Sequence, residues 1–221
     1  MKQLFFTLLI SSLSANEWKL VWSDEFDGKG HPDPKKWGYE SGFVRNKEQQ
    51  YYTTKRLKNA RLENGHLVIE VRAKVPQGPG VWPAIWTLGD NIDTVGWPRC
   101  GEIDILEFVG KDPQHIHVNT HFHRDGKHSS DHKKRKGNEP WKDFHTYSIE
   151  WDADWIHFAY DDVRYHSFRV SKGDTEKGNP FHKKHYLILN LALGGNWGGK
   201  IDDSIFPSRY LIDYVRVYQR P

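Results

Sequence analysis

Three carboxylates stand close together in the apolar stretch GEIDILEF at residues 101–108. Its β-branched and aromatic residues predict a strand, in which successive side chains point to opposite faces. Glu102 and Asp104 then share one face, whereas a regular strand turns Glu107 toward the core. An unpaired carboxylate is costly there, so a regular strand does not explain the pattern.

A β-bulge resolves this conflict, because one extra residue at Ile105 or Leu106 places two residues opposite one on the partner strand. Glu107 then rejoins the face of Glu102 and Asp104, and the Cα atoms of the two glutamates lie roughly 13 Å apart. Two glutamates leaning inward from there can bring their carboxyl groups to about 5 Å, the spacing of a retaining glycosidase. Asp104 can share a proton with Glu102, since neighbouring like charges raise proton affinity. The plainer alternative is the solvated polar face of an edge strand.

Length and composition favour a single all-β domain. The 221 residues include ten tryptophans and 14% aromatic residues, enough for a substantial core. Turn residues separate many short β-rich runs, and no long stretch has a helical period. We expect a jelly-roll sandwich of two antiparallel sheets with an open substrate cleft. The predicted strands lie at 18–26, 67–75, 84–88, 102–109, 115–122, 146–151, 155–160, 163–170, 186–193 and 211–219, with the three runs in 146–170 forming a meander.

The first residues have the layout of a short secretory signal peptide: a lysine, an apolar run at 4–10, then small residues to Ala15. We therefore expect a signal peptide at 1–15, a catalytic domain at 16–221, and a protein secreted to the periplasm or the extracellular space. No other segment approaches the length of a membrane span, so we expect no membrane association. The single cysteine, Cys100, cannot form an intramolecular disulfide and is expected to be a small buried residue.

Several tryptophans are candidates for binding sugar rings, whose C–H faces need flat apolar surfaces. Trp82, Trp97 and Trp197 lie next to proline or glycine in predicted loops, where an aromatic side chain is more often presented outward. Trp86 is expected to belong to the core.

Several segments together resemble a glycoside hydrolase family 16 enzyme of the laminarinase type, over nearly all of the expected mature chain. They are WSDEF at 22–26, RNKEQQYY at 45–52, VWPAIW at 81–86, EIDILEF at 102–108, LNLALGGNW at 189–197 and DYVRVY at 213–218. The resemblance implies a β-jelly-roll and retaining endo-hydrolysis of β-1,3 linkages in glucans. Glu102 would be the nucleophile, Asp104 its assistant and Glu107 the acid/base. The extra residue in the motif is similar to the bulged laminarinase subgroup.

The same resemblance implies further site residues. His121 would sit beside the acids, Arg45 and Asn46 would contact sugar hydroxyls, and the three outward tryptophans would line subsites. No cofactor is expected for catalysis, but a structural calcium ion is expected opposite the cleft. Its ligands would be Asp213 and backbone oxygens near Gly65 and Glu25, which suits the preference of calcium for oxygen ligands.

One segment departs from the family pattern. Two further strands usually stand between a segment like LVIE at 67–70 and one like VRAKV at 71–75, and here the two are joined directly. No turn residue interrupts the joined segment, which predicts one continuous strand with alternating apolar and polar faces. The sandwich is then expected to have fewer strands than its relatives and a less protected edge.

Three other functions compete with this hypothesis. Mixed-linkage β-1,3-1,4-glucan is an alternative substrate, and a noncatalytic β-glucan-binding module on the same fold would keep the tryptophans but gain nothing from crowded acids. A metal site is conceivable at His115, His117, His121 and His123, which share parity along one strand. The basic residues at 132–136 lie in a polar stretch at 123–138 that predicts a mobile surface loop, and with a net charge of +3 they do not indicate a nucleic-acid partner. We expect a monomer.

Overall fold

The computed structural model describes residues 18–63, 66–72, 75–137 and 139–219. The predicted signal peptide lies outside them. The described chain is mostly antiparallel β-structure in two layers, which confirms the all-β sandwich expected from the sequence. No helix in the described part of the chain is long and apolar enough to cross a membrane.

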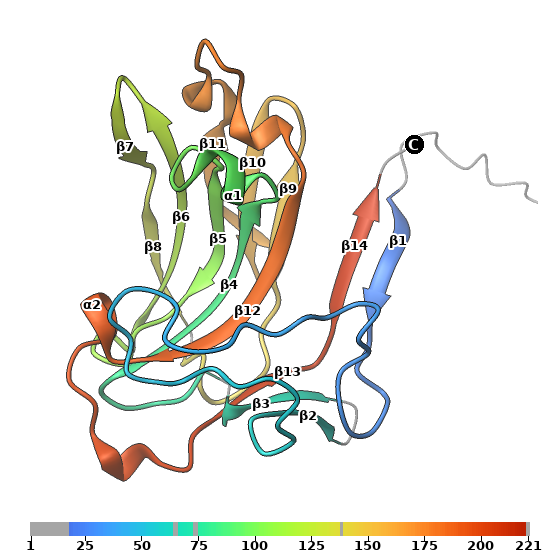
Figure 1. The fold of residues 1–221 in the computed structure, drawn as a ribbon, viewed down its shortest axis with the longest axis vertical. Helices are drawn as coiled ribbons and strands as arrows, with labels where there is room; N and C mark the ends of the chain where they lie inside the picture. Colours follow the sequence, from blue (N-terminus) through green and yellow to red (C-terminus); the bar gives the residue numbers. More distant parts are fainter. Residues whose placement is uncertain (1–17, 64–65, 73–74, 138, 220–221) are drawn as a thin grey trace, which may run out of the picture.

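One layer is a single curved sheet of six strands, in which sequence neighbours β4, β5 and β6 lie side by side (Figure 1). Each pair in it is antiparallel, and both β7 and β8 pair with β6. Its strands, in spatial order, are β12 (His185–Leu193), β4 (Val81–Gly89), β5 (Glu102–Glu107), β6 (His115–Arg124) and β7 (Lys127–Ser130), with β8 (Lys133–Lys136) beside the other half of β6.

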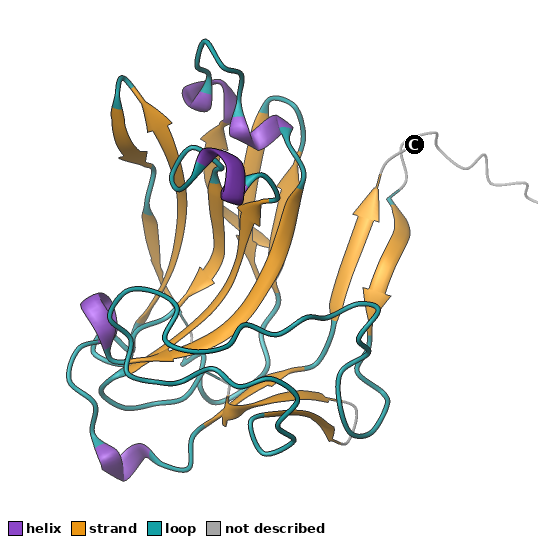
Figure 2. Cartoon of the chain, viewed as in Figure 1, coloured by secondary structure: helices purple, strands orange, loops and turns teal. Residues whose placement is uncertain are grey.

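The other strands form three smaller sheets. The predicted meander is confirmed as β9 (Tyr147–Trp151), β10 (Trp155–Tyr160) and β11 (Val163–Arg169). A second sheet joins β2 (Ala60–Glu63), β3 (His66–Arg72) and β13 (Arg209–Ile212), and a third pairs β1 (Lys19–Asp24) with β14 (Val215–Gln219). Within the described residues, helical structure is limited to single turns (Figure 2): α1 (Ile92–Val95), α2 (Gly195–Gly198) and 3₁₀ turns at Val170–Gly173, Pro180–His182 and Asp203–Ile205.

The core lies between the large sheet and the smaller ones. One cluster joins the large sheet to the meander. Its buried members are Ile103, Val118 and Phe122 of the large sheet, Ile156 and Phe158 of β10, Phe168 of β11, and Val170 and Phe181 of the 3₁₀ turns. A second cluster joins the large sheet to β13 and β10, and its members are Phe26, Val75, Val81, Leu106, Phe108, Ile116, Tyr160, Leu191, Tyr210 and Ile212. Alternate residues of the large sheet are therefore committed to the core, which leaves its other face for a cleft.

Two sequence predictions need correction. The stretch at 123–138 is not a mobile loop: it contains β7 and β8, and a turn at Asp125 and Gly126, both with positive φ, reverses the chain as in a type I′ hairpin. The strand predicted at 84–88 begins earlier, at Val81, so that Trp82 lies within β4 and not in a loop.

The first part of the joined segment runs as one strand, β3 (His66–Arg72), without the reversal between Ile69 and Arg72 that would have contradicted the prediction, but Val75 lies outside any strand. Its ladder with β13 is irregular, since Tyr210 pairs with Ile69 and Arg209 with Arg72. Residues 73–74 and the side chains of the segment lie outside the description.

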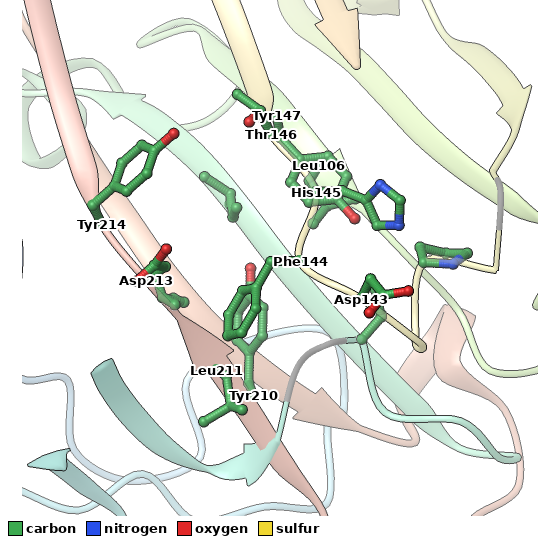
Figure 3. Close-up of a pocket in the computed structure, with 14 residues that line it drawn as sticks. Leu106, Asp143, Phe144, His145, Thr146, Tyr147, Tyr210, Leu211, Asp213 and Tyr214 are labelled. Atoms are coloured by element: carbon green, nitrogen blue, oxygen red, sulfur yellow. The ribbon is translucent and has the colours of Figure 1, made fainter. Parts of the chain in front are cut away.

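The layer of small sheets is incompletely closed. In Figure 1 the β1–β14 pair stands to one side of the large sheet. A hollow of about 160 Å³ opens behind β4 and β5, with Leu106, Phe144, Tyr147, Tyr210 and Ile212 among its walls (Figure 3). Side chains on this side of the acidic strand therefore adjoin a gap and lose packing contacts there.

Candidate active site

The acidic strand β5 contains the predicted bulge. Opposite β4, Asp104 pairs with Trp86 and Leu106 with Ile85, so Ile105 is the extra residue. The ladder to β6 is interrupted at the same place, between Asp104 and Glu107. Ile105 and Leu106 both pack toward the core clusters, and the alternation of side chains is reset.

The reset brings the three acids to one pocket. Glu102, Asp104 and Glu107 line it from β5, and β4, β12 and the segment before β2 supply the other walls. The remaining lining residues are Arg45, Asn46, Glu48, Trp82, Ala84, Trp86 and Asn190. The pocket is thus a concave site on the face of the large sheet that is turned away from the core.

Glu107 is the acid most strongly shifted toward its protonated form. Burial, followed by the charges of Asp104 and Glu102, raises the pKa of Glu107 well above its usual range. The indole N–H of Trp82 donates to Glu107 Oε1 at 3.1 Å and opposes this shift in part. This shift favours the protonated form of Glu107, which is the form that can give a proton to a leaving oxygen.

Glu102 has a different environment. Burial and the charge of Asp104 raise the pKa of Glu102 to about 8, while His121 and the indole N–H of Trp97, at 2.8 Å from Oε2, favour its ionised form. Burial raises the pKa of Asp104 to about 7, and a side-chain hydrogen bond joins Glu102 and Asp104. The pair can hold one proton between them and release Glu102 as a carboxylate, the form required of a nucleophile.

His121 lies beside these acids, as expected. Its Nε2 is 3.3 Å from Asp104 Oδ2 and 3.8 Å from Glu102 Oε1. Its other ring nitrogen lies 2.8 Å from Nε2 of His128 on β7, and the amide of Asn119 lies 3.0 Å from its Nε2. Burial lowers the pKa of His121, so the ring is neutral near pH 7.

The predicted tryptophans lie on this face, at different distances from the acids. Trp82 and Trp97 each donate a hydrogen bond to a catalytic candidate, and Trp97 is 47% exposed, which suits a ring-stacking surface. Trp197 lies one ring further out, edge-on to Trp82 at 5.6 Å between centroids and close to His117 at 4.9 Å.

Arg45 and Asn46 lie in the pocket wall, as expected. The guanidinium of Arg45 stacks over the ring of Trp86 at 4.9 Å and pairs with Glu40. Asn46 donates to Glu48 at 3.3 Å. Both are held in place before any sugar binds, which lowers the entropic cost of recognition.

Sequence reasoning missed three polar or aromatic residues that line the pocket: Trp86, Glu48 and Asn190. Trp86 is 7% exposed, consistent with a core residue, but it also lines the pocket and donates to Asn190 at 2.8 Å. Glu48 is 7% exposed and accepts hydrogen bonds from Gln50 and Tyr52. The signal for Asn190 was available: it is the one polar residue in the apolar run LILNLAL at 187–193.

The histidines of β6 do not form the metal site considered from their parity. His117 stacks on His132 and His121 on His128, in two separate pairs. Among described residues, the side chains close enough to hold an ion together are Glu102, Asp104 and His121. Cys100 is fully buried, as expected, and burial raises the pKa of its thiol.

The expected calcium ligands are described only in part. Gly65 lies outside the described residues, and the carboxylate of Glu25 is engaged by the guanidinium of Arg216. Asp213 is exposed at the mouth of the hollow behind β5 (Figure 3). Because two of the three ligands would be backbone oxygens, the calcium site stays a prediction, and no catalytic step depends on it.

Comparison with known proteins agrees with this geometry. The family model "Glycosyl hydrolases family 16" matches residues 43–216. The chain belongs to this family. As a family 16 member with glucanase relatives over most of its length, it is a glycoside hydrolase that acts on glucans.

Two relatives of this family 16 chain come from Rhodothermus marinus. Its beta-glucanase is 38% identical, with 93% of this chain and 86% of the relative covered. The X-ray structure of its laminarinase superposes with a TM-score of 0.82 at 35% identity, covering 92% of this chain and 98% of the other. The first alignment spans 248 positions, more than the 221 residues here, so the relative has residues without a counterpart in this chain.

A non-specific endo-beta-1,3(4)-glucanase, solved with an oligosaccharide at its active site, superposes with a TM-score of 0.81 at 35% identity, covering 92% of this chain and 95% of the other. Together these neighbours establish the jelly-roll fold of family 16 for this chain.

Proposed function

We propose that this family 16 hydrolase cleaves internal β-1,3-glucosidic bonds of laminarin-type glucans with retention of anomeric configuration. The observation that supports this most is the bulge at Ile105, which places Glu102 and Glu107 in the same pocket. A retaining reaction needs two carboxyl groups on one bond, one as nucleophile and one as acid.

The environments of the two glutamates divide these roles. Glu107, whose pKa burial and both neighbouring acids raise, donates its proton to the leaving oxygen, while Glu102 attacks the anomeric carbon and forms a glycosyl-enzyme ester. Water then attacks the same carbon, Glu107 takes its proton, and Glu102 leaves as a carboxylate. Asp104 orients Glu102 through their hydrogen bond and holds the proton that Glu102 gives up.

Aromatic rings and fixed polar groups would bind the glucan around these acids. Trp97 offers an exposed face beside Glu102, and Trp82 and Trp197 form a second surface beside Glu107. Arg45, held over Trp86, and Asn46 would donate to sugar hydroxyls from the pocket wall. Each ring stacked on a sugar excludes water from an apolar face.

Incubation with laminarin and with mixed-linkage β-1,3-1,4-glucan, followed by product analysis, tests the substrate. We expect oligosaccharides of intermediate size from laminarin, because the cleft is open. Exclusive cleavage of mixed-linkage glucan would replace β-1,3-glucan as the substrate, an outcome that the non-specific relative makes worth testing.

Proton NMR of the earliest products tests the mechanism separately. Retention gives the β-anomer first, before mutarotation mixes the two forms. The α-anomer first would rule out the assigned pair of roles. Secretion by a signal peptide at 1–15 is a further proposal, and N-terminal sequencing of the exported protein checks it.

A further inference from the structure

The side chains of Glu102, Asp104 and His121 lie at the spacing of metal ligands. One ligand atom from each lies within 4.8 Å of the others. Zinc binds imidazole nitrogen and carboxylate oxygen at about 2.0–2.2 Å, so two ligands in a tetrahedral arrangement lie roughly 3.4 Å apart. The distance from His121 Nε2 to Asp104 Oδ2 is 3.3 Å, and to Glu102 Oε1 it is 3.8 Å. Both fit around one ion, the second at a wider angle.

The orientation of these atoms is independent evidence for a shared third atom. Asp104 is 2% exposed, and its Oδ2 has no hydrogen-bond partner among the described residues, although His121 Nε2 is only 3.3 Å away. The pair is close enough for a hydrogen bond but not aligned for one. Asp104 Oδ2 is therefore a buried acceptor without a donor, which a bound cation would satisfy.

The surroundings of His121 also suit a metal ligand. His128 Nε2 lies 2.8 Å from its Nδ1 and can accept the proton there, which leaves Nε2 unprotonated, as a metal ligand must be. Asn119 Nδ2 lies 3.0 Å from Nε2, and a bound ion would displace this donor. The side chains of Glu102 and His121 remain 15% and 18% exposed, so an ion can enter from the cleft and keep a water as fourth ligand.

We propose that zinc binds reversibly to Glu102, Asp104 and His121 and blocks the active site. The site offers two carboxylate oxygens and one imidazole nitrogen. Imidazole is a good ligand for zinc, whereas calcium and magnesium prefer oxygen ligands alone, so the set favours zinc. The inhibition, unlike the binding, rests on the proposed role of Glu102: a carboxylate bound to zinc is no longer available to attack a sugar. Zinc and glucan therefore exclude each other from the cleft.

Titration calorimetry with zinc chloride tests the site, using full-length untagged protein freed of metal by a chelator. We expect one zinc per chain, and at least tenfold weaker binding in Asp104→Asn and His121→Gln. His123→Gln is the matched control, since His123 lies on the same strand two residues further and outside the trio. Its zinc affinity should equal that of the wild type. Circular dichroism checks that each variant is folded.

Three outcomes would overturn the site: no zinc bound by the wild type, unchanged affinity in both Asp104→Asn and His121→Gln, or loss of binding in His132→Gln, which would place zinc at the His117–His132 pair.

The inhibition is tested with the wild type and His123→Gln on laminarin, where zinc should slow hydrolysis at the concentrations at which it binds and excess chelator should restore it. Zinc binding without inhibition would overturn the blocking role. An inactive protein that still binds zinc at the trio would contradict the proposed function and leave the site standing.

Discussion

Six strands of the described chain hydrogen-bond into one continuous sheet, whereas the layer behind it is divided among three small sheets. The continuous sheet holds the acids, and its bulge, its pocket and the tryptophan donors are all in place. The divided layer leaves a hollow behind Leu106 and sets the β1–β14 pair to one side (Figures 1 and 3).

The difference indicates that chemistry and stability are borne by different parts of this molecule. Ladders to β4 and β6 on either side fix the direction of each acid. The residues behind β5 determine instead how firmly that strand is held, because packing contacts are lost wherever a void adjoins a side chain. Changes on the cleft face should therefore affect turnover, and changes in the divided layer should affect melting.

The largest effect is expected for Glu102→Ser. Removing the nucleophile should lower the initial rate on laminarin by about 10⁴-fold or more, while oligosaccharide binding persists. Melting temperature should not fall, since the change relieves carboxylate crowding and leaves only a small cavity. Calorimetric titration with a laminari-oligosaccharide and a thermal melt provide the two measurements. Near-normal hydrolysis would remove Glu102 from the mechanism.

Glu107→Gln should have the next largest effect. Loss of the general acid typically costs about 10²–10⁴-fold in rate. An aryl glycoside needs no protonation of its leaving group, so the variant should retain much more activity on that substrate than on laminarin. Azide, which needs no general base, should accelerate the second step. Azide can also enter the space left in Glu102→Ser, but attack from that side gives the α-glycosyl azide, whereas attack on the ester in Glu107→Gln gives the β-glycosyl azide. The opposite assignment of the two azide products would contradict the division of roles.

A matched pair of truncations compares the two layers directly. Leu106 and Ile212 belong to the same core cluster and both line the hollow, but Leu106 lies on the acidic strand and Ile212 on β13. Either change to alanine should lower the free energy of unfolding by about 2–5 kcal/mol. For a domain of this size that corresponds to roughly 2–4 °C in melting temperature per kcal/mol.

Turnover should separate the two variants. Leu106→Ala frees the residue next to Glu107, and a displacement of about 1 Å at a catalytic group can cost 10²-fold in rate. Ile212→Ala should keep kcat within about twofold of the wild-type value, a much smaller change than the 10²-fold loss expected from a displaced catalytic group. Denaturant unfolding and initial rates on laminarin measure the pair. Equal loss of kcat in Leu106→Ala and Ile212→Ala would show that the divided layer also positions the acids. If Leu106→Ala does not fold, Leu106→Val takes its place.

The sequence predicted the features that depend on neighbours along the chain. The bulge followed from parity alone, since Glu107 could reach the face of Glu102 only with one residue added. The Asp125–Gly126 turn was equally available from local residues, but the many charges at 127–136 obscured the strands beyond it.

Features that depend on contacts between distant segments could not be predicted. The pairing of Trp86 with Asn190 joins residues 104 positions apart, and the cleft role of Trp86 depends on it. The single predicted strand at 211–219 is divided between β13 and β14, which belong to different sheets. The core-facing residues change parity there, from Tyr210 and Ile212 to Val215, but apolar residues stand at both parities of 211–218, so periodicity gives no sign of the change.

The smallest effect expected concerns the pH dependence of stability and distinguishes the two layers by thermal melting alone. Folding raises the pKa of Glu102 from 4.5 to about 8 and that of Asp104 from 3.8 to about 7. Between the lower and higher values the folded state binds more protons than the unfolded state, so stability falls as pH rises. The contribution of these acids is fully present below about pH 4 and is lost as pH rises through 7 to 8.

Glu102→Gln removes one titratable group, and with it one of the protons by which the folded and unfolded states differ. Its melting temperature, measured in chelator-containing buffer, should fall less than that of the wild type between pH 5 and pH 9, because a neutral amide has no charge to desolvate. Ile212→Ala is the control from the other layer: it lies on β13, so its melting curve should run parallel to that of the wild type across the same range. Groups elsewhere in the chain titrate equally in all three proteins and cancel in the differences. Identical pH slopes for the wild type and Glu102→Gln would mean that the crowded acids do not destabilise the fold, and that the cleft face and the layer behind it contribute to stability in the same way.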